Sequence, residues 1–267
     1  LASSAAGFAA LAFGLGKLFN LNFDSVATLA RYGSGSACRS VCGGWTHWYC
    51  DDGHVETFLP ANHWPDLCAV IAIVSESQKS VSSTEAMQRS VNTSTLIKYR
   101  TKFVVPERIK QLKIALEKCD FKQFASIVMA DSNQLHAICM DTMPPIGYLT
   151  EVSHTLISLA HGFNAIHQSE TSIAYTFDAG PNACFLVSKS VLKQFLSHLT
   201  AVFPPRSSNL HDFVRFESNF EQLSNDYDSL SEKTLCDWLR IKPVPDGLKQ
   251  LFVTRVGAGP SVIAKSW

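Results

Sequence analysis

Three short segments of the chain combine small, hydroxyl-bearing and charged residues in ways that could bind anions or move a proton. The first is residues 1–7, Leu-Ala-Ser-Ser-Ala-Ala-Gly, which include Ser3 and Ser4. Small residues at the start of a helix let a phosphate group approach free backbone N–H groups, and serine hydroxyls add donors or face a magnesium ion. A plain helix N-cap is the simpler interpretation of the same two serines.

The second segment is residues 33–40, Gly-Ser-Gly-Ser-Ala-Cys-Arg-Ser. Its glycines expose bare backbone, which makes Gly35 a candidate contact to an anionic group together with Ser34 and Ser36. Arg39 follows where its guanidinium could make a bidentate contact with a carboxylate or a phosphate. On the pattern alone, a Gly/Ser turn followed by a surface arginine is the simpler interpretation.

The third segment is residues 175–183, Tyr-Thr-Phe-Asp-Ala-Gly-Pro-Asn-Ala. Asp178 ends an apolar strand and precedes a rigid turn, so we expect its carboxylate to be fixed at the edge of a scaffold. An aspartate that caps its own turn is the simpler interpretation. Two lesser candidates are Ser83, in the Ser/Thr segment 82–84, and the segment 131–133, Asp-Ser-Asn, with His136 on a helix. We interpret that histidine as packed or capping rather than catalytic.

The composition is that of a globular protein. The 267 residues are 46% hydrophobic and 17% charged, which suits one large domain or two small ones. There are 23 basic and 23 acidic residues, so the net charge is zero and we expect no nucleic-acid or membrane partner. The eight cysteines favour buried free thiols over a disulfide framework. A zinc site would use Cys42, His47 and Cys50, but no C-x2-C pair supports it.

Residues 1–19 form the longest apolar stretch of the chain, and a helix is expected at 1–18. Lys17 interrupts it and it lacks the basic n-region of a signal peptide, so we predict a buried helix rather than a membrane span. The large apolar residues that recur at helical spacing and define its expected buried face are Phe8, Leu11, Leu15, Leu18 and Phe19.

The remaining hydrophobic pattern predicts an α+β sandwich, with helices against one mainly antiparallel sheet. Helices are expected at 24–31, 105–136 with a break near Cys119, 146–167 and 191–203. Strands are expected at 67–74, 172–177, 184–187 and 249–256. The polar stretch 75–94 is expected to be a loop or mobile element, and 207–241 an acidic excursion.

Together and in this order, the three segments resemble the galactokinase/homoserine kinase/mevalonate kinase/phosphomevalonate kinase (GHMP kinase) superfamily. Residues 1–7 match the end of its phosphate-loop motif. Within the superfamily, residues 33–40, 129–137, 141–146 and 175–183 resemble the mevalonate diphosphate decarboxylase family.

The resemblance implies a two-domain GHMP-kinase-like fold. Residues 1–65 would be the remnant of an N-terminal ribosomal-protein-S5-like domain that is mostly missing, because the family's N-terminal region does not precede Leu1. Residues 66–267 would be a ferredoxin-like C-terminal domain that carries Asp178, with the active site between the two domains.

The resemblance also implies a reaction. ATP phosphorylates the 3-hydroxyl of mevalonate 5-diphosphate, and phosphate and CO2 then leave to give isopentenyl diphosphate. Asp178 would face the 3-hydroxyl as a general base or charge stabiliser, and Arg39 would hold the departing carboxylate. The residues implied to contact the substrate diphosphate are Ser34, Gly35 and Ser36.

Ser3 and Ser4 would contact the ATP phosphates, with Ser3 facing Mg²⁺ through them, and Ser83 would approach the transferred phosphate. The resemblance further implies a homodimer in the cytoplasm, with the peroxisome as the alternative compartment. Two other functions stay open: a related small-molecule kinase that stops after phosphorylation, and a truncated, non-catalytic form that only binds ligand or dimerises.

Overall fold

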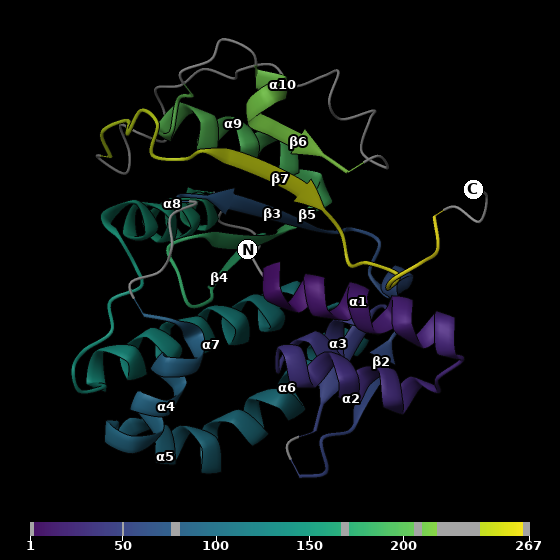
Figure 1. Cartoon of the computed structure of the whole chain (residues 1–267). Coiled ribbons are helices and arrows are strands. Elements are labelled where there is room, and N and C mark those ends of the chain that lie inside the picture. The colour runs from purple at the N-terminus through teal and green to yellow at the C-terminus, as the bar shows by residue number, and fades with distance from the viewer. Residues whose placement is uncertain are drawn as a thin grey trace. The chain divides into compact units, whose positions relative to one another are not determined.

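A computed structural model describes residues 3–49, 51–75, 81–166, 171–205, 210–217 and 241–263, with side chains from Ser4 onward and without those of 210–211 (Figure 1). The chain divides into two compact units. The first joins Leu1–Pro65 with Arg255–Trp267, and the second is Asp66–Thr254. None of the described helices is both long enough and apolar enough to cross a membrane.

The first unit is a small helical cluster beside a two-stranded hairpin. Its elements are α1 (Ser3–Phe19), α2 (Phe23–Gly33), α3 (Ala37–Ser40), β1 (Trp45–Trp48), β2 (Val55–Leu59) and the 3-10 helix η1 (Ala61–His63). Strands β1 and β2 pair antiparallel. Asn22 starts α2, because its Oδ1 accepts a hydrogen bond from the Ser25 N–H at 2.9 Å and so satisfies one free helix amide.

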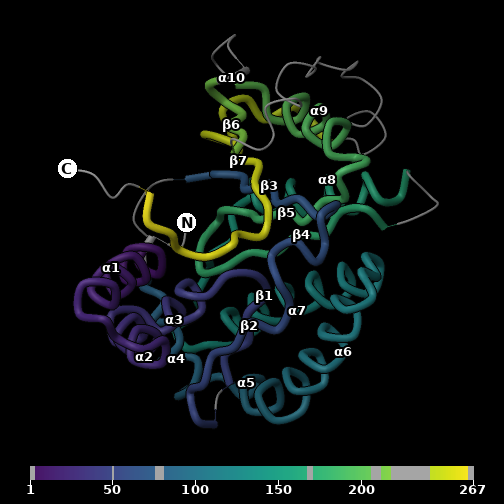
Figure 2. The backbone as a smooth tube through the Cα atoms, turned by 90° about the vertical axis from the view of Figure 1, so that its right-hand side faces the viewer, coloured from purple at the N-terminus to yellow at the C-terminus, as the bar shows by residue number. Residues whose placement is uncertain are grey.

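Helices α1 and α2 lie side by side (Figures 1 and 2), and small residues make the contact. α1 buries Ala5, Ala9 and Ala12, which recur at helical spacing and let the two backbones approach closely. A Cβ added at Gly33 of α2 would lie 2.0 Å from the Phe8 ring.

The prediction of a buried face formed by the large residues of α1 is therefore wrong within the described chain. The side chains of that face are 40–74% exposed: Phe8, Leu11, Leu15, Leu18 and Phe19. The helix itself is confirmed. The periodicity correctly identified an apolar face of α1. The face that is buried, however, is the neighbouring one formed by the alanines, because small residues allow the close packing of this unit.

Residues 255–263 belong to the first unit, where they cross the turn between α3 and β1. Gly44 donates its N–H to the carbonyl of Gly257 at 2.8 Å, and Gly44 has a positive φ of 78°. A Cβ added at Gly43 would lie 2.0 Å from the carbonyl oxygen of Ala258. Because both partners in this contact are backbone, neither can swing aside, and only glycine fits at position 43.

We therefore expect Gly43→Ala to lower the free energy of unfolding by about 1–3 kcal/mol, the usual cost of overpacking a close contact. Gly257→Ala is the matched control, because a Cβ at Gly257 meets nothing within 4 Å. Thermal unfolding of the two variants checks this, and equal melting temperatures would contradict the close approach at Gly43.

The second unit is a five-stranded sheet with helices around it. Its elements are β3 (Leu67–Ile73), α4 (Ser83–Thr93), α5 (Leu96–Tyr99), the π-helix η2 (Arg100–Val104), α6 (Val105–Glu117), α7 (Phe121–Asp141), α8 (Glu151–Ile166), β4 (Ile173–Phe177), β5 (Ala183–Ser188), the 3-10 helix η3 (Lys189–Val191), α9 (Leu192–Val202), α10 (Leu210–Phe213), β6 (Val214–Phe216) and β7 (Gln250–Thr254).

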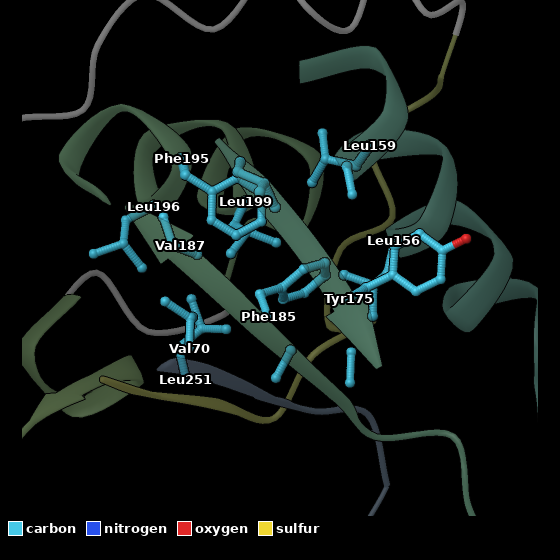
Figure 3. Close-up of a cluster of buried hydrophobic side chains, with 14 of the residues drawn as sticks. Val70, Leu156, Leu159, Tyr175, Phe185, Val187, Phe195, Leu196, Leu199 and Leu251 are labelled. Atoms are coloured by element: carbon cyan, nitrogen blue, oxygen red, sulfur yellow. The ribbon is translucent and has the colours of Figure 1, made fainter. Parts of the chain in front are cut away.

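The sheet has the strand order β4-β5-β3-β7-β6. All neighbours pair antiparallel except β6 and β7, which run parallel. The expected α+β class with a mainly antiparallel sheet is confirmed. Helices α8 and α9 pack against one face of the sheet (Figure 3), and the rings of Phe185 on β5 and Phe195 on α9 meet with centroids 4.9 Å apart.

Two predicted elements of this unit differ from the structure. The stretch 75–94 contains helix α4, because Ser82 caps it by accepting a hydrogen bond from the Glu85 N–H at 3.2 Å. The Ser/Thr-rich sequence of this stretch predicts a loop, but one of its serines starts a helix. The predicted helix at 146–167 begins only at Glu151. Its first turn is capped by Thr150 and Ser153: the Ser153 hydroxyl accepts the Thr150 N–H, and the Thr150 hydroxyl accepts the Ser153 N–H.

Some predictions fall outside the described residues. Most of the acidic excursion at 207–241 does so, apart from 210–217 and Ile241, where α10 and β6 are found. Cys50 and Cys236 also lie outside. The other six cysteines are free thiols, and Cys38, Cys68 and Cys139 are buried.

Candidate functional site

The Gly/Ser segment forms a compact turn between α2 and α3. Helix α2 ends at Gly33, and Ser34 donates its N–H back to the Ala30 carbonyl at 3.1 Å. The Ser34 carbonyl then accepts the N–H of Ala37 at 2.8 Å, which starts α3. A Cβ at Gly35 would have only the Trp48 ring within 4 Å, at 3.8 Å. The turn is thus held at both ends while its middle, at Gly35, stays exposed.

The structure brings the first two predicted segments together. Ser4 on the first turn of α1 and Ser34 in the Gly/Ser turn have their hydroxyl oxygens 3.4 Å apart. The first amides of α1, a helix of 17 residues, have no partner within the helix and carry the positive end of its dipole. This part of the first unit therefore offers hydroxyl and amide donors to one anion. Ser3 begins the helix, but its side chain lies outside the described atoms.

Arg39 lies on α3 and is exposed. Its guanidinium carbon lies 5.8 Å from the centroid of the Trp48 ring on β1, a cation–π arrangement. The Nε1 atom of Trp48 is buried and has no hydrogen-bond partner among the described residues. The sequence interpretation overlooked Trp48. Because cation–π contacts favour arginine over tryptophan, the aromatic run 45–49 was the signal that could have suggested it.

Asp178 follows the last residue of β4 in the second unit, and its side chain is exposed. The turn behind it is anchored by side chains from other elements. Ser153 on α8 donates its hydroxyl to the Pro181 carbonyl at 2.9 Å. The side-chain oxygen of Asn182 accepts the N–H of Val74 at 2.8 Å, which joins the turn to the end of β3. A carboxylate that is exposed on an anchored turn is available to a ligand in a fixed position.

Helix α7 carries a second polar cluster. Asp131 accepts hydrogen bonds from Arg100 at 2.7 Å and Arg108 at 2.9 Å, and both arginines also bind Gln134. Burial raises the pKa of Asp131, but the two arginine contacts outweigh burial and hold that pKa below its ordinary value. These contacts tie η2 and α6 to α7, so Arg100 and Arg108 have a structural role.

His136, one turn after Ser132 on α7, is buried, as the sequence interpretation expected. Burial lowers the pKa of its imidazole below the usual 6.5, against a backbone hydrogen bond with Phe177 and the charge of Asp178, which both raise it. The unfolded chain therefore binds a proton at His136 at a higher pH than the folded chain does. It follows that acidification below pH 6.5 favours unfolding.

We expect the free energy of unfolding to fall progressively as the pH decreases from 6.5 to the lower pKa that His136 has in the folded chain. The slope from this one group approaches about 1.4 kcal/mol per pH unit. Urea unfolding across this window, for the wild type and His136→Gln, measures it. The variant should show a flatter dependence, and identical slopes would assign the acid sensitivity to other groups.

Ser83 is the first residue of α4 and is exposed, next to the capping residue Ser82. It belongs to the same unit as Asp178, whereas Ser4, Ser34 and Arg39 belong to the first unit. Among the described residues, no group of three or more His, Cys, Asp or Glu side chains could hold a metal ion. Cys50, one member of the zinc set considered above, lies outside that part of the chain.

The α+β fold and these segments define a protein of the GHMP-kinase-like class. Two family models cover most of the chain: one described as "Diphosphomevalonate decarboxylase-like N-terminal domain" matches residues 1–58, and one described as "Mevalonate 5-diphosphate decarboxylase C-terminal domain" matches residues 69–263. The chain therefore belongs to the mevalonate 5-diphosphate decarboxylase family.

Individual relatives agree. The diphosphomevalonate decarboxylase of Danio rerio is 42% identical over 98% of this chain and 65% of its own length. The structure of the Trypanosoma brucei mevalonate diphosphate decarboxylase is 35% identical with a TM-score of 0.85, covering 97% of this chain and 68% of its own. A third structure, 32% identical with a TM-score of 0.68 over 76% and 63% of the two chains, is "MDDEF in complex with MVAPP, AMPPCP and Magnesium". The chain spans about 65% of the length of its first curated relatives.

Proposed function

We propose that the protein catalyses the ATP-dependent decarboxylation of mevalonate 5-diphosphate to isopentenyl diphosphate, releasing ADP, phosphate and CO2. The observation that carries the proposal is the match of two decarboxylase family models, in order, to regions that together contain every candidate residue. The N-terminal match holds Ser3, Ser4, the Gly/Ser turn and Arg39, and the C-terminal match holds Ser83 and Asp178.

The first unit supplies groups that suit the anionic ends of this substrate. Ser34, Gly35 and Ser36 would bind its diphosphate with hydroxyl and backbone donors. Arg39 would hold its carboxylate, which a fork of guanidinium donors fits. The Trp48 ring supports this role, because it lies beside Gly35 and its cation–π contact holds the Arg39 guanidinium.

ATP phosphates would bind Ser4 and the free amides at the start of α1, with Ser3 beside them and Ser83 approaching the transferred phosphate. The hydroxyl pair of Ser4 and Ser34 fits phosphate oxygens. The described residues provide no carboxylate cluster for a metal ion, so Mg²⁺ would be held mainly through the phosphates, as is usual for this ion. Bound there, Mg²⁺ would neutralise phosphate charge.

Asp178 would accept the proton of the 3-hydroxyl, or stabilise its charge, as that oxygen attacks the terminal phosphorus of ATP. ADP leaves, and the 3-oxygen now carries a phosphoryl group. The C3–O bond then breaks with its electron pair going to phosphate. The electrons of the bond to the carboxylate form the alkene, and CO2 departs. No electron-accepting organic cofactor is required, because phosphate is a good leaving group.

We further propose a homodimer that works in the cytoplasm, with the peroxisome as the alternative compartment. The support for both is the family resemblance. Light scattering of the purified chain measures the assembly, and a single-chain mass at micromolar concentration would reject the dimer. Imaging of a tagged copy in cells distinguishes the two compartments.

Following ADP, phosphate and CO2 from mevalonate 5-diphosphate and Mg-ATP tests the proposal. We expect the three products in equal amounts. ADP without CO2 would instead indicate a kinase that stops after phosphorylation. Binding of both substrates without ADP would indicate a form that binds ligand only. The presence of Arg39 favours decarboxylation over phosphorylation alone, since phosphorylation does not require a contact with the carboxylate.

A further inference from the structure

Strand β4, which leads to Asp178, lies at the edge of its sheet. Among the described strands it pairs with β5, with Ile173 opposite Val187 and Phe177 opposite Ala183. An edge strand leaves alternate backbone groups without a strand partner, and in a buried setting these groups need other partners. At the start of β4, Asn164 on α8 provides them: its amide donates to the Ile173 carbonyl at 2.8 Å and accepts the Ile173 N–H at 3.1 Å.

At the other end of β4, helix α7 provides the partners. The Ser132 hydroxyl accepts the N–H of Phe177 at 2.9 Å, and Ser132 is only 4% exposed. The Asn133 side chain accepts the hydroxyl of Tyr175 at 3.1 Å. Phe177 immediately precedes Asp178, so the Ser132 contact acts on the peptide unit next to the candidate base.

His136 acts on the same residue. It follows Ser132 by four positions, so both side chains leave α7 on one face. Its ring meets the Phe177 ring edge-on with centroids 6.3 Å apart, and the nearby Phe177 backbone raises the pKa of its imidazole. The Tyr148 ring also lies edge-on to the imidazole, with centroids 6.5 Å apart. Its Nε2 is buried without a hydrogen-bond partner in the described chain.

We propose that Ser132 and His136 are positioning residues for Asp178: they clamp Phe177, the last residue of the edge strand, and so fix where the Asp178 carboxylate stands. The consequence for the reaction rests on the proposed function. The clamp itself does not, because it is built from contacts to Phe177 within the second unit. Catalytic geometry is sensitive to displacements of about 1 Å, which can lower rates about 10²-fold.

The imidazole of His136 provides a readout of the clamp that requires no turnover. The charged and titratable groups that influence it are Asp178, whose carboxylate raises its pKa, and His154 on α8, which lowers it. Removal of the Asp178 charge should therefore lower the pKa of His136. If Ser132 fixes the distance between the two groups, this response should shrink when Ser132 is replaced.

The test is a four-protein cycle on the full chain: wild type, Asp178→Asn, Ser132→Ala and the double variant. The pKa of His136 is measured by NMR titration of its ring protons. We expect Asp178→Asn to lower that pKa in the wild-type background, and to lower it by less than half as much in the Ser132→Ala background. Equal shifts in both backgrounds would overturn the proposal.

Steady-state kinetics tests the consequence. Ser132→Ala should lower kcat about 10–100-fold with KM changed less than about twofold, and Ser132→Thr, which keeps the acceptor oxygen, should recover most of the loss. Ser197→Ala is the matched control, because Ser197 is equally buried but its hydroxyl donates to the Lys193 carbonyl of its own helix. A kcat for Ser132→Ala equal to that of the control would reject the role in positioning.

The two proposals fail in different ways. Full turnover in Asp178→Asn would remove Asp178 from the reaction, while the NMR cycle would still report on the clamp. Conversely, loss of turnover in Asp178→Asn together with normal kinetics in Ser132→Ala would retain the function and reject the clamp. If Ser132→Ala does not fold, the cycle is repeated with Ser132→Cys, whose thiol is a weaker acceptor for the Phe177 N–H, and equal shifts of the His136 pKa in the two backgrounds would then overturn the proposal.

Discussion

Replacing Asp178 with asparagine is expected to lower kcat about 10²–10⁴-fold, the range typical of losing a general base. Asparagine keeps the size and hydrogen-bonding shape of the side chain but cannot accept the hydroxyl proton. Because the turn behind Asp178 is held by Ser153 and Asn182, the substitution should leave the turn in place. Substrate affinity, measured by equilibrium binding, should change little, since the diphosphate and carboxylate are assigned to the other unit.

Asp120→Asn is the matched control for this variant. Asp120 lies in the same unit and is exposed, and its carboxylate caps α7 by accepting the Gln123 N–H at 3.0 Å. Asparagine caps a helix about as well as aspartate does, so both stability and kcat should be retained. Equal kcat values for Asp178→Asn and Asp120→Asn would remove Asp178 from the mechanism. A fall in both would instead indicate a general effect of the lost charge.

The sequence predicted the sheet strands β3, β4, β5 and β7 because each is a short apolar run bounded by turn residues. It missed α4 because Ser and Thr in a polar stretch indicate a loop and a helix cap equally well. It assigned the wrong face of α1, since hydrophobicity ranks leucine above alanine, while the close approach of α2 selects the smaller residue. The sequence shows which residues share a helix face, but whether that face is buried depends on the element that packs against it.

The same limit applies to the candidate site. Asp178 and Arg39 could be named because their types and local turns are visible along the chain. Their supporting contacts could not, because Ser132 meets Phe177 from a helix distant in sequence and Trp48 meets Arg39 from strand β1. Ser132 meets Phe177, 45 positions away, only after α7 lies along β4. A serine in the middle of a helix has no sequence feature that reveals such a contact.

Replacing Arg39 with lysine is expected to lower kcat/KM about 10–100-fold. A charge-assisted hydrogen bond contributes about 1.5–3 kcal/mol, and each 1.4 kcal/mol corresponds to about tenfold. Lysine retains the positive charge but cannot form the two parallel contacts that a guanidinium makes with a carboxylate, and it stacks less well on an aromatic ring. The measurement is the rate of CO2 release at low substrate concentration. Arg31→Lys is the control, because Arg31 lies in the same unit and donates to the Gly53 carbonyl at 2.9 Å.

A Trp48 variant shows whether Trp48 acts on kcat/KM through Arg39 or independently of it. If the Trp48 ring orients Arg39, then Trp48→Leu should lower kcat/KM about two- to fivefold, in line with about 0.5–1 kcal/mol for an exposed cation–π contact. In the Arg39→Lys background the same change should have a smaller effect, because the guanidinium that the ring orients is already gone. Fully additive effects would mean that Trp48 contributes independently of Arg39. Loss of kcat/KM in Arg31→Lys as large as in Arg39→Lys would contradict the assignment of the carboxylate to Arg39.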